Sequence, residues 1–510
     1  MAALLRWSRL LSARSAARRS ALLTVLILGI VPLAVVSPLP AQSLKKRLDR
    51  TLDVPPLDRH LWGIAVADST GRMLYGRNAE RLFIPASNTK LVVTAVAASL
   101  LPADFTVRTS VYATGPLTDG TVAGHLVLYG RGDPSMDERC FGVDTALAGV
   151  CAPDAMAPLR QLAHDLWTRG VRTVSGNLVG DGSYFEAELR HPSWEHSDLT
   201  WWYAAPVSGL GFATNSVELT ATATSLGAPA ALTVAPWLGD LSLDNRTRTV
   251  PEGMARTLDV VREPGTEQVI VTGDVPVSER PARESVAVTD PNRYAVLAFR
   301  QALAEVGIAV LGGTESTTDS LLFQEARRGT PLAEVESRPL KDWLFPILNT
   351  SQNWYAEMLL KQLGRQFGQA GSWHEGLAVE RRFLIDRVGI DSTQFSLSDG
   401  SGLSAINLVT PAALVRLLTF MRQQPSYLTW SAGLPVSGQR GSLRARFLGG
   451  DLEGKVMAKT GSISTVNSLS GYLTRRDGRL VIFSIQANHH TLGGRNMIAA
   501  IDSVVGQLAR

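Results

Sequence analysis

A long stretch of β-type sequence interrupts this chain and constrains its fold more than any other feature. Between about residues 101 and 284, short apolar runs alternate with glycine-containing turns, and only residues 159–168 have a helical pattern. The candidate strands in this stretch include 106–112, 125–129 and 176–179. From residue 291 a mixed α/β pattern resumes and lasts to the C-terminus. We therefore expect one domain in two halves, with the β-type stretch inserted between them.

The length of 510 residues exceeds what one ordinary hydrophobic core contains, so two or three domains are expected. Residues 216–264 are rich in Thr, Ala, Leu and Val with little helical periodicity, which indicates a small β unit of its own. The predicted layout is an export signal at 1–41, a main domain formed by 42–100 and 285–510, an inserted domain formed by 101–215 and 265–284, and a third domain at 216–264 nested within the second.

The composition is that of a globular protein, with 45% hydrophobic and 19% charged residues. Five arginines and no acidic residue lie in residues 1–41, so the net charge of +4 becomes −1 for the rest of the chain. The basic character therefore belongs to the N-terminus and gives no argument for nucleic-acid binding.

The N-terminus is typical of an export signal. A basic segment precedes the apolar run Ala21–Val36, and a small residue, Ala41, marks a cleavage point. A retained membrane anchor is the alternative, because the apolar run approaches the length that spans a bilayer. Either interpretation places the body of the protein outside the cytoplasm, in the periplasm or at the exterior of the cell envelope.

The chain has two cysteines, Cys140 and Cys151. In an oxidising compartment they would close a short loop, worth about 2–3 kcal/mol, and two free thiols are the alternative. Without a CxxC pattern they do not indicate a zinc site.

A serine and a lysine three residues apart are the first candidates for catalysis. Pro85 precedes a run rich in Ala, Leu and Val, which is typical of the start of a buried helix. Ser87 and Lys90 then share one helix face, and a lysine amine with a lowered pKa can accept the proton of a serine nucleophile. Taken alone, the same spacing fits a helix-capping serine beside a solvated lysine.

Two later stretches supply partners for this pair. Ser351 is expected to cap a helix, and Asn353 follows it at the edge of a cleft. Lys459 lies on a late strand, where Gly461 would let the backbone of a ligand approach closely. An ordinary helix cap and an ordinary strand end are the alternatives for each stretch alone.

Together, Ser-x-x-Lys, Ser-x-Asn and Lys-Thr-Gly occur in the order used by penicillin-recognising serine acyltransferases. The chain resembles, more narrowly, the class C low-molecular-mass penicillin-binding proteins, the D-alanyl-D-alanine carboxypeptidase/endopeptidase family. The interval of 264 residues between Ser87 and Ser351 matches the two extra domains of this family, and the similarity covers nearly all of the chain after the signal. The stretches that carry it are 130–135, 180–185, 203–208, 398–404 and 438–443.

The resemblance implies a multidomain α+β protein with a penicillin-binding-protein/β-lactamase-like transpeptidase fold, in which helices flank an antiparallel sheet and two mostly β domains are inserted. It also implies that Ser87 attacks the carbonyl between two D-alanines of a peptidoglycan stem peptide, with Lys90 as the base. Ser351 and Lys459 would relay a proton to the departing D-alanine, and the backbone N–H groups of Ser87 and Ser462 would hold the oxyanion.

The same resemblance implies the binding groups and partners. Asn353 would bind the substrate amide, while Thr460, Gly461 and Ser462 with the Lys459 charge would form the site for the terminal carboxylate. The expected partners are stem peptides and, as inhibitors, β-lactams, with possible association with a membrane surface. No metal, cofactor or nucleic acid is expected.

Two positions depart from the family pattern. Ser462 stands where threonine is usual and keeps the hydroxyl. Ala405 stands where an arginine commonly lines the pocket for the stem-peptide side chain. Alanine makes no charged contact, so the preference for a free diaminopimelyl end is left open, as is the balance between carboxypeptidase and endopeptidase activity.

Two other functions fit part of the pattern. A non-catalytic cell-wall-binding protein would keep the fold but is expected to lose Ser87, Lys90, Ser351, Asn353 or Lys459, and all five residue types are present. A broader amidase or esterase would use the same site and is distinguished by its activity on esters. A Ser-His-Asp hydrolase is disfavoured because no Gly-x-Ser-x-Gly occurs.

Overall fold

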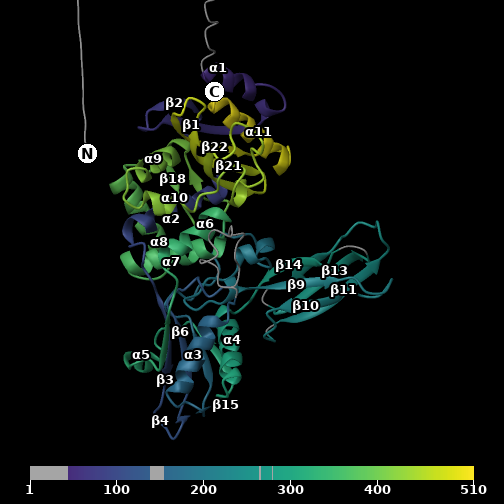
Figure 1. Cartoon of the computed structure of the whole chain (residues 1–510), viewed down its shortest axis with the longest axis vertical. Coiled ribbons are helices and arrows are strands. Elements are labelled where there is room, and N and C mark those ends of the chain that lie inside the picture. The colour runs from purple at the N-terminus through teal and green to yellow at the C-terminus, as the bar shows by residue number, and fades with distance from the viewer. Residues whose placement is uncertain (1–43, 138–153, 240, 264–265, 278–279) are drawn as a thin grey trace, which may run out of the picture. The chain divides into compact units, whose positions relative to one another are not determined.

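The computed structural model of the chain describes residues 44–137, 154–239, 241–263, 266–277 and 280–510 (Figure 1). The predicted export signal and both cysteines, Cys140 and Cys151, lie outside these residues. Within them, no helix combines the length and the apolar character needed to cross a bilayer.

A five-stranded antiparallel sheet joins the two ends of the described chain. Its order is β2-β1-β22-β21-β20, with β1 at Leu61–Asp68, β2 at Met73–Arg77, β20 at Val456–Ile463, β21 at Val466–Thr474 and β22 at Leu480–Asn488. Strand β1 pairs with β22 along its whole length. The turns at residues 68–71 and 477–478 join β1 to β2 and β21 to β22 as antiparallel hairpins.

Alternate side chains of β1 enter two different cores, as the period of two in a strand requires. Ile64 and Val66 pack with α1 (Leu44–Leu52) and α11 (Gly494–Leu508) on one face of the sheet. Ala65 and Ala67 face a second core built from helices on the other face. Helices therefore cover both faces of this sheet.

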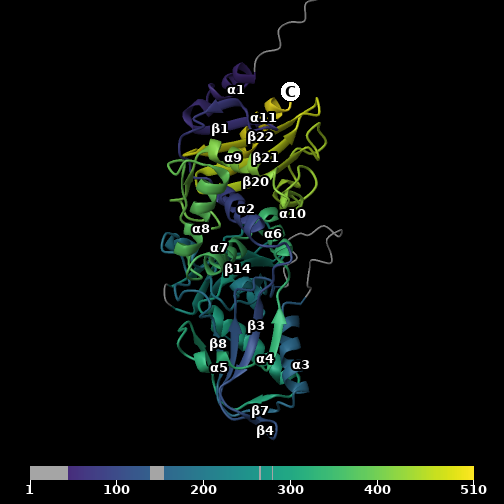
Figure 2. The same cartoon turned by 90° about the vertical axis from the view of Figure 1, so that its left-hand side faces the viewer.

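The second core contains the helices that begin at Lys90 and Asn353, two of the candidate site residues. Helix α2 (Lys90–Leu100) is buried from Lys90 to Ala98, which suits a sequence that is apolar apart from Lys90, Thr94 and Ser99. It contacts the helices α6 and α7 (Figure 2). The helices of this region are α6 (Leu340–Asn349), α7 (Asn353–Phe367), α8 (Trp373–Phe383), α9 (Pro411–Met421) and α10 (Tyr427–Ser431), with the π-helix η7 at Leu384–Val388.

A second five-stranded sheet is built mainly from the interposed sequence, in the order β16-β8-β6-β3-β17. Its strands are β3 (Arg108–Ala113), β6 (Leu126–Gly130), β8 (Leu178–Asp181), β16 (Thr314–Thr317) and β17 (Ala333–Glu336). The helices α3 (Ala157–Thr168) and α4 (Pro291–Glu305) share its hydrophobic core. Residues 291–336 thus pack with residues 108–181.

A smaller four-stranded sheet has the order β15-β7-β5-β4. Its strands are β4 (Leu117–Thr118), β5 (Thr121–Val122), β7 (Thr173–Val174) and β15 (Ala309–Val310), and the short helix α5 lies at Gln324–Arg328.

Every described helix or strand between residues 216 and 287 is a strand, and these form two three-stranded sheets. The first sheet has the order β10-β9-β14 and consists of β9 (Ser216–Thr222), β10 (Ala231–Ala235) and β14 (Ala282–Ala287). The second has the order β11-β13-β12 and consists of β11 (Ser242–Val250), β12 (Asp259–Arg262) and β13 (Gln268–Pro276). The β character expected for residues 216–264 therefore extends to residue 287.

Candidate active site

The candidate nucleophile lies at the entrance to the buried helix α2. The 3₁₀ helix η2 (Ala86–Thr89) leads directly into α2, so Ser87 is placed one turn before Lys90. Lys90 Nζ lies 3.1 Å from Ser87 Oγ, within the hydrogen-bond reach that the sequence spacing predicts. Ser87 is partly exposed, whereas Lys90 is fully buried.

Lys90 is held by neutral oxygens. Besides Ser87, its Nζ donates to Asn353 Oδ1 and to the carbonyl oxygen of Ser401, both at 2.6 Å. Burial lowers the pKa of Lys90 to about 7, although the charges of Asp399 and Glu357 oppose this shift. A large fraction of the amine is then neutral near pH 7 and able to accept a proton from a hydroxyl.

Ser351 lies between α6 and α7, and the prediction that it caps the second helix is wrong. Gln352 is the N-cap, and its side chain accepts a hydrogen bond of 3.3 Å from Trp354 N. Ser351 has a φ of 65°, a left-handed conformation that turns the chain between the helices. Its hydroxyl instead accepts a hydrogen bond of 2.8 Å from Lys459 Nζ.

Lys459 forms the second serine–lysine pair from strand β20. It is fully buried, and its Nζ also donates to the carbonyl oxygen of Thr460 at 2.8 Å. Burial is the main cause that holds the pKa of Lys459 well below its ordinary value, and the charge of Lys90 adds to it. Because the two lysines repel each other's protons, the site disfavours two positive charges when nothing is bound.

The hydroxyls of Thr460 and Ser462 lie two residues apart and so share one face of β20. Thr460 Oγ1 donates to Ser442 Oγ at 2.7 Å. Ser462 Oγ accepts from Asn467 Nδ2 at 2.7 Å, and Ser462 is exposed. Both hydroxyls are therefore fixed by a neighbour, with Ser462 directly open to a ligand.

Gly461 lies where β20 passes against η2. A Cβ atom there would come within 2.8 Å of the Pro85 carbonyl oxygen and 2.3 Å of Ser468 Oγ. The glycine is thus required for the close approach of two protein segments, which brings the Lys459 strand beside Ser87. The further expectation from the sequence, that Gly461 lets the backbone of a ligand approach closely, stays a prediction.

Two buried carboxylates that were not predicted from the sequence lie near Lys90. Glu357, on α7, accepts hydrogen bonds from Ser401 N at 2.7 Å, Gly400 N at 3.1 Å and Trp373 Nε1 at 2.8 Å. Burial raises the pKa of Glu357 to about 7, with a further contribution from Asp399. Glu357 follows Asn353 by four residues, so it lies on the same helix face, and this spacing is the signal that was available.

Asp399 organises the loop between β18 (Phe395–Ser396) and β19 (Leu408–Val409). Its carboxylate accepts from Gly402 N and Ser404 N, each at 2.7 Å. These bonds shape the turn that presents the Ser401 carbonyl to Lys90. The stretch 398–404 was singled out in the sequence without a role for its aspartate.

Asn353 connects the nucleophile to the inserted sequence. Its Oδ1 accepts from Lys90, and its Nδ2 donates to the carbonyl oxygen of Tyr203 at 2.8 Å. Both ends of the amide are therefore engaged, which fixes its orientation. Ala405, the position of the missing arginine, is exposed on the Asp399 loop.

In the described part of the chain, no three His, Cys, Asp or Glu side chains are grouped so as to hold a metal ion. The arrangement brings together Ser87, Lys90, Ser351, Asn353 and Lys459 from three separate stretches of sequence. A partly exposed serine beside a buried amine of lowered pKa is suited to nucleophilic attack on an acyl carbon.

Comparisons with known proteins agree with this chemistry. The profile of the D-Ala-D-Ala carboxypeptidase 3 (S13) family matches residues 44–508. A D-alanyl-D-alanine carboxypeptidase from an Actinomadura species is 35% identical, over 97% of this chain and 91% of that protein. The D-alanyl-D-alanine carboxypeptidase DacB of Haemophilus influenzae is 27% identical, over 81% of this chain and 82% of that protein.

The fold is that of a solved penicillin-binding protein. The crystal structure of penicillin binding protein 4 (dacB) from Haemophilus influenzae matches with a TM-score of 0.76 at 24% identity, covering 91% of this chain and 98% of that one. The expected α+β transpeptidase-like fold with inserted domains is therefore confirmed. The chain belongs to the D-Ala-D-Ala carboxypeptidase 3 (S13) family of low-molecular-mass penicillin-binding proteins and is a serine-type D-Ala-D-Ala carboxypeptidase.

Proposed function

We propose that Ser87 is the nucleophile of this carboxypeptidase and that Lys90 is its general base. The observation that carries the proposal is the 3.1 Å contact between Lys90 Nζ and Ser87 Oγ, together with the pKa of about 7 for the fully buried amine. Ser87 Oγ attacks the carbonyl carbon between two D-alanines of a stem peptide, and its proton passes to Lys90 Nζ. The oxyanion is held by the backbone N–H groups of Ser87 and Ser462.

The second serine–lysine pair completes the proton transfer. Collapse of the tetrahedral intermediate breaks the peptide bond, and the departing D-alanine nitrogen takes up a proton relayed through Ser351 and Lys459. The 2.8 Å bond between Lys459 Nζ and Ser351 Oγ supports this role. Water then hydrolyses the acyl-Ser87 ester, releasing the shortened peptide and restoring the serine.

Binding of the substrate carboxylate is assigned to the hydroxyls of Thr460 and Ser462 and to the ammonium of Lys459. In the free protein, burial and the charge of Lys90 both disfavour a charged Lys459. An arriving carboxylate favours protonation of Lys459, and that charge in turn favours a neutral Lys90. Substrate binding thereby prepares the base for attack. Asn353 orients the substrate amide.

A β-lactam would enter the same site and leave an acyl group on Ser87. The Haemophilus influenzae penicillin binding protein 4 has been solved in complex with a β-lactam, at a TM-score of 0.72 and 22% identity. That complex is a property of the Haemophilus influenzae protein. For this chain, the proposal rests on the geometry of Ser87, Lys90 and Ser462.

We place the protein outside the cytoplasm, where stem peptides are found. Residues 1–41 are removed as the export signal.

We also propose a revised domain layout. Because α4 and β15–β17 share sheets and a core with the interposed strands, the return to the main domain is placed near residue 337 rather than at 285. The nested β unit is extended from residue 264 to 287 for the same reason.

Release of D-alanine from a peptide ending in D-Ala-D-Ala tests the assignment. Ser87→Ala and Lys90→Met are each expected to abolish turnover, whereas Ser69→Ala and Lys455→Met, at exposed positions, retain it. Folding of each variant is checked by thermal unfolding. Full turnover by a folded Ser87→Ala variant would contradict the proposal, and activity on an ester but not on the peptide would favour the broader esterase.

A further inference from the structure

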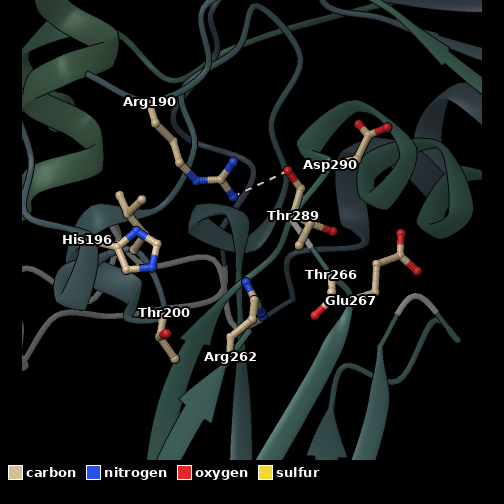
Figure 3. Close-up of a pocket in the computed structure, with 9 residues that line it drawn as sticks. Arg190, His196, Thr200, Arg262, Thr266, Glu267, Thr289 and Asp290 are labelled. Carbon is tan, nitrogen blue, oxygen red and sulfur yellow. Dashed lines mark hydrogen bonds between the residues drawn. The ribbon is translucent and has the colours of Figure 1, made fainter. Parts of the chain in front are cut away.

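A cavity of about 390 Å³ lies away from the serine–lysine pairs, between residues 190–200, the edge of the nested β unit and the start of α4. Figure 3 shows the side chains that line it, among them Arg190, His196, Arg262, Glu267 and Asp290. Its volume falls at the lower end of the range of small-molecule sites. It is thus large enough for an amino acid or the end of a peptide.

Two guanidinium groups form the centre of this cavity. Arg190 and Arg262 come from different parts of the chain. Their guanidinium groups point from opposite sides towards the middle of the cavity (Figure 3). Both are fixed by one backbone stretch, residues 287–289. Arg190 Nη2 donates to the Val288 carbonyl oxygen at 3.0 Å, and Arg262 Nη2 donates to that of Ala287.

The charge of Arg190 is not neutralised by a protein carboxylate. Its guanidinium donates to the carbonyl oxygens of Val288 and Thr289, and no carboxylate of the described residues forms an ion pair with it. The side chain is partly buried, and burial lowers the pKa of Arg190. A partly desolvated cation held only by neutral acceptors gains free energy when an anion binds beside it.

Two carboxylates lie on one side of the arginines. Figure 3 shows Glu267 and Asp290 on the same side of the two guanidinium groups. Asp290 caps α4, accepting from Asn292 N and Arg293 N, whereas Glu267 is exposed. The cavity thus has positive charge at its centre and negative charge on one side. A ligand that complements both carries a carboxylate for the arginines and an ammonium group for Glu267.

The chain segment on one side of the cavity also contacts residues around the active site. The segment that supplies Arg190 and His196 also supplies Trp194, whose Nε1 donates to Asp399 at 3.0 Å. A few residues later, the Tyr203 carbonyl accepts from Asn353. One chain segment therefore borders the cavity and also contacts Asp399 and Asn353 near the catalytic residues.

We propose that this cavity is a second binding site for an α-amino-acid zwitterion, with its carboxylate between Arg190 and Arg262 and its ammonium group towards Glu267. Two sources supply this chemistry. One is free D-alanine, which the carboxypeptidase reaction releases, and the other is the free amino-acid end of a diaminopimelyl side chain on a wall peptide. The inference does not depend on the residue roles proposed for Ser87 and Lys90.

The test is calorimetric titration of the full protein after acylation with benzylpenicillin, which blocks the Ser87 site. The probes are D-alanine, meso-diaminopimelate and inorganic phosphate. At least one amino acid is expected to bind saturably, and phosphate more weakly. Binding of D-alanine identifies the reaction product as a ligand, whereas binding of meso-diaminopimelate alone identifies the wall-peptide end.

Matched variants assign the binding to the cavity. Arg262→Gln and Glu267→Gln are each expected to weaken amino-acid binding about tenfold or more, as for loss of a hydrogen bond to a charged group. Arg283→Gln, an exposed arginine on β14, and Glu263→Gln, an exposed glutamate close to the cavity, should leave it unchanged. Because Glu267 is exposed, its variant is expected to fold even if Arg262→Gln does not.

Three results would overturn the proposal: no binding of either amino acid, binding unaffected by both cavity variants, or phosphate binding as tight as that of the amino acids. Failure of benzylpenicillin to acylate the protein would count against Ser87 as nucleophile instead. The same titrations on the unacylated protein would then report on the cavity, because the variants lie outside the catalytic cleft.

Discussion

Glu357 Oε1 accepts a 2.7 Å hydrogen bond from the backbone N–H of Ser401, whose carbonyl oxygen in turn lies 2.6 Å from Lys90 Nζ. The buried carboxylate thereby positions one of the three oxygens around the candidate base. Its charge also favours the protonated form of Lys90. Glu357 is therefore a positioning residue with an electrostatic effect on the base.

Glu357→Gln is expected to slow acylation by benzylpenicillin about tenfold, corresponding to about 1.4 kcal/mol in the barrier. The amide cannot accept from all three N–H donors around it, so the Ser401 turn shifts. Loss of the negative charge also lowers the pKa of Lys90, so the pH–rate midpoint should move down. The measurement is the acylation rate as a function of pH.

Glu325→Gln, on a side chain 95% exposed, is the matched control and should change neither rate nor midpoint. A slower rate with an unchanged midpoint would leave Glu357 with a purely structural role. That outcome would contradict the electrostatic part of the account.

The acylation rate of the unmodified protein should rise with pH and level off, with a midpoint near pH 7. Lys90 acts as a base only when neutral, and its amine is neutral above its pKa of about 7. Stopped-flow or quenched acylation between pH 5 and 9 measures this profile. A rate independent of pH across this range would exclude a titrating Lys90 as the base.

Lys90 also makes stability depend on pH. Its pKa is lowered in the folded state, so between about pH 7 and pH 10.4 the unfolded chain binds a proton that the folded chain does not. The free energy of unfolding therefore gains up to about 1.4 kcal/mol per pH unit from this residue as the pH rises. Relative to the Lys90→Met variant, the unmodified protein should gain stability across this window.

Denaturant unfolding of both proteins at several pH values provides the comparison. Lys455→Met, at an exposed lysine, should show no such pH-dependent difference. Parallel stability curves for the unmodified protein and Lys90→Met would show that the pKa of Lys90 is not lowered by folding.

Gly461→Ala should destabilise the protein by about 1–3 kcal/mol and reduce acylation, because the added methyl group overlaps the Pro85 carbonyl and Ser468 Oγ. Strand β20 would then move away from η2. Thermal unfolding and acylation measure the two effects. Gly494→Ala, where a Cβ atom meets nothing within 4 Å, is the control, and an effect no larger than this control would contradict the packing argument.

The parts of the site that follow a local rule were predictable from the sequence. The spacing of Ser87 and Lys90 on helical backbone places their side chains together, and the turn at Asp477-Gly478 sets the pairing of β21 with β22. The family resemblance brought in Ser351 and Lys459, which local periodicity cannot relate because 108 residues separate them.

The parts that depend on tertiary packing were not predictable. The expected cap at Ser351 failed because the chain turns through a left-handed residue there, which leaves Gln352 to cap the helix. Glu357 and Asp399 approach Lys90 from two distant segments. The four-residue spacing from Asn353 to Glu357 indicates a shared helix face, but no spacing rule indicates that either carboxylate is buried. The mixed α/β pattern that begins at residue 291 likewise does not indicate which sheet α4 packs against.

The most direct test of the central claim is the intact mass of the purified protein after incubation with benzylpenicillin, beside the Ser87→Ala variant. The account predicts one penicilloyl adduct on the unmodified protein and none on the variant, with the adduct located on the peptide that contains Ser87. An unmodified mass for the folded protein, or an adduct that persists in Ser87→Ala, would contradict Ser87 as the activated nucleophile.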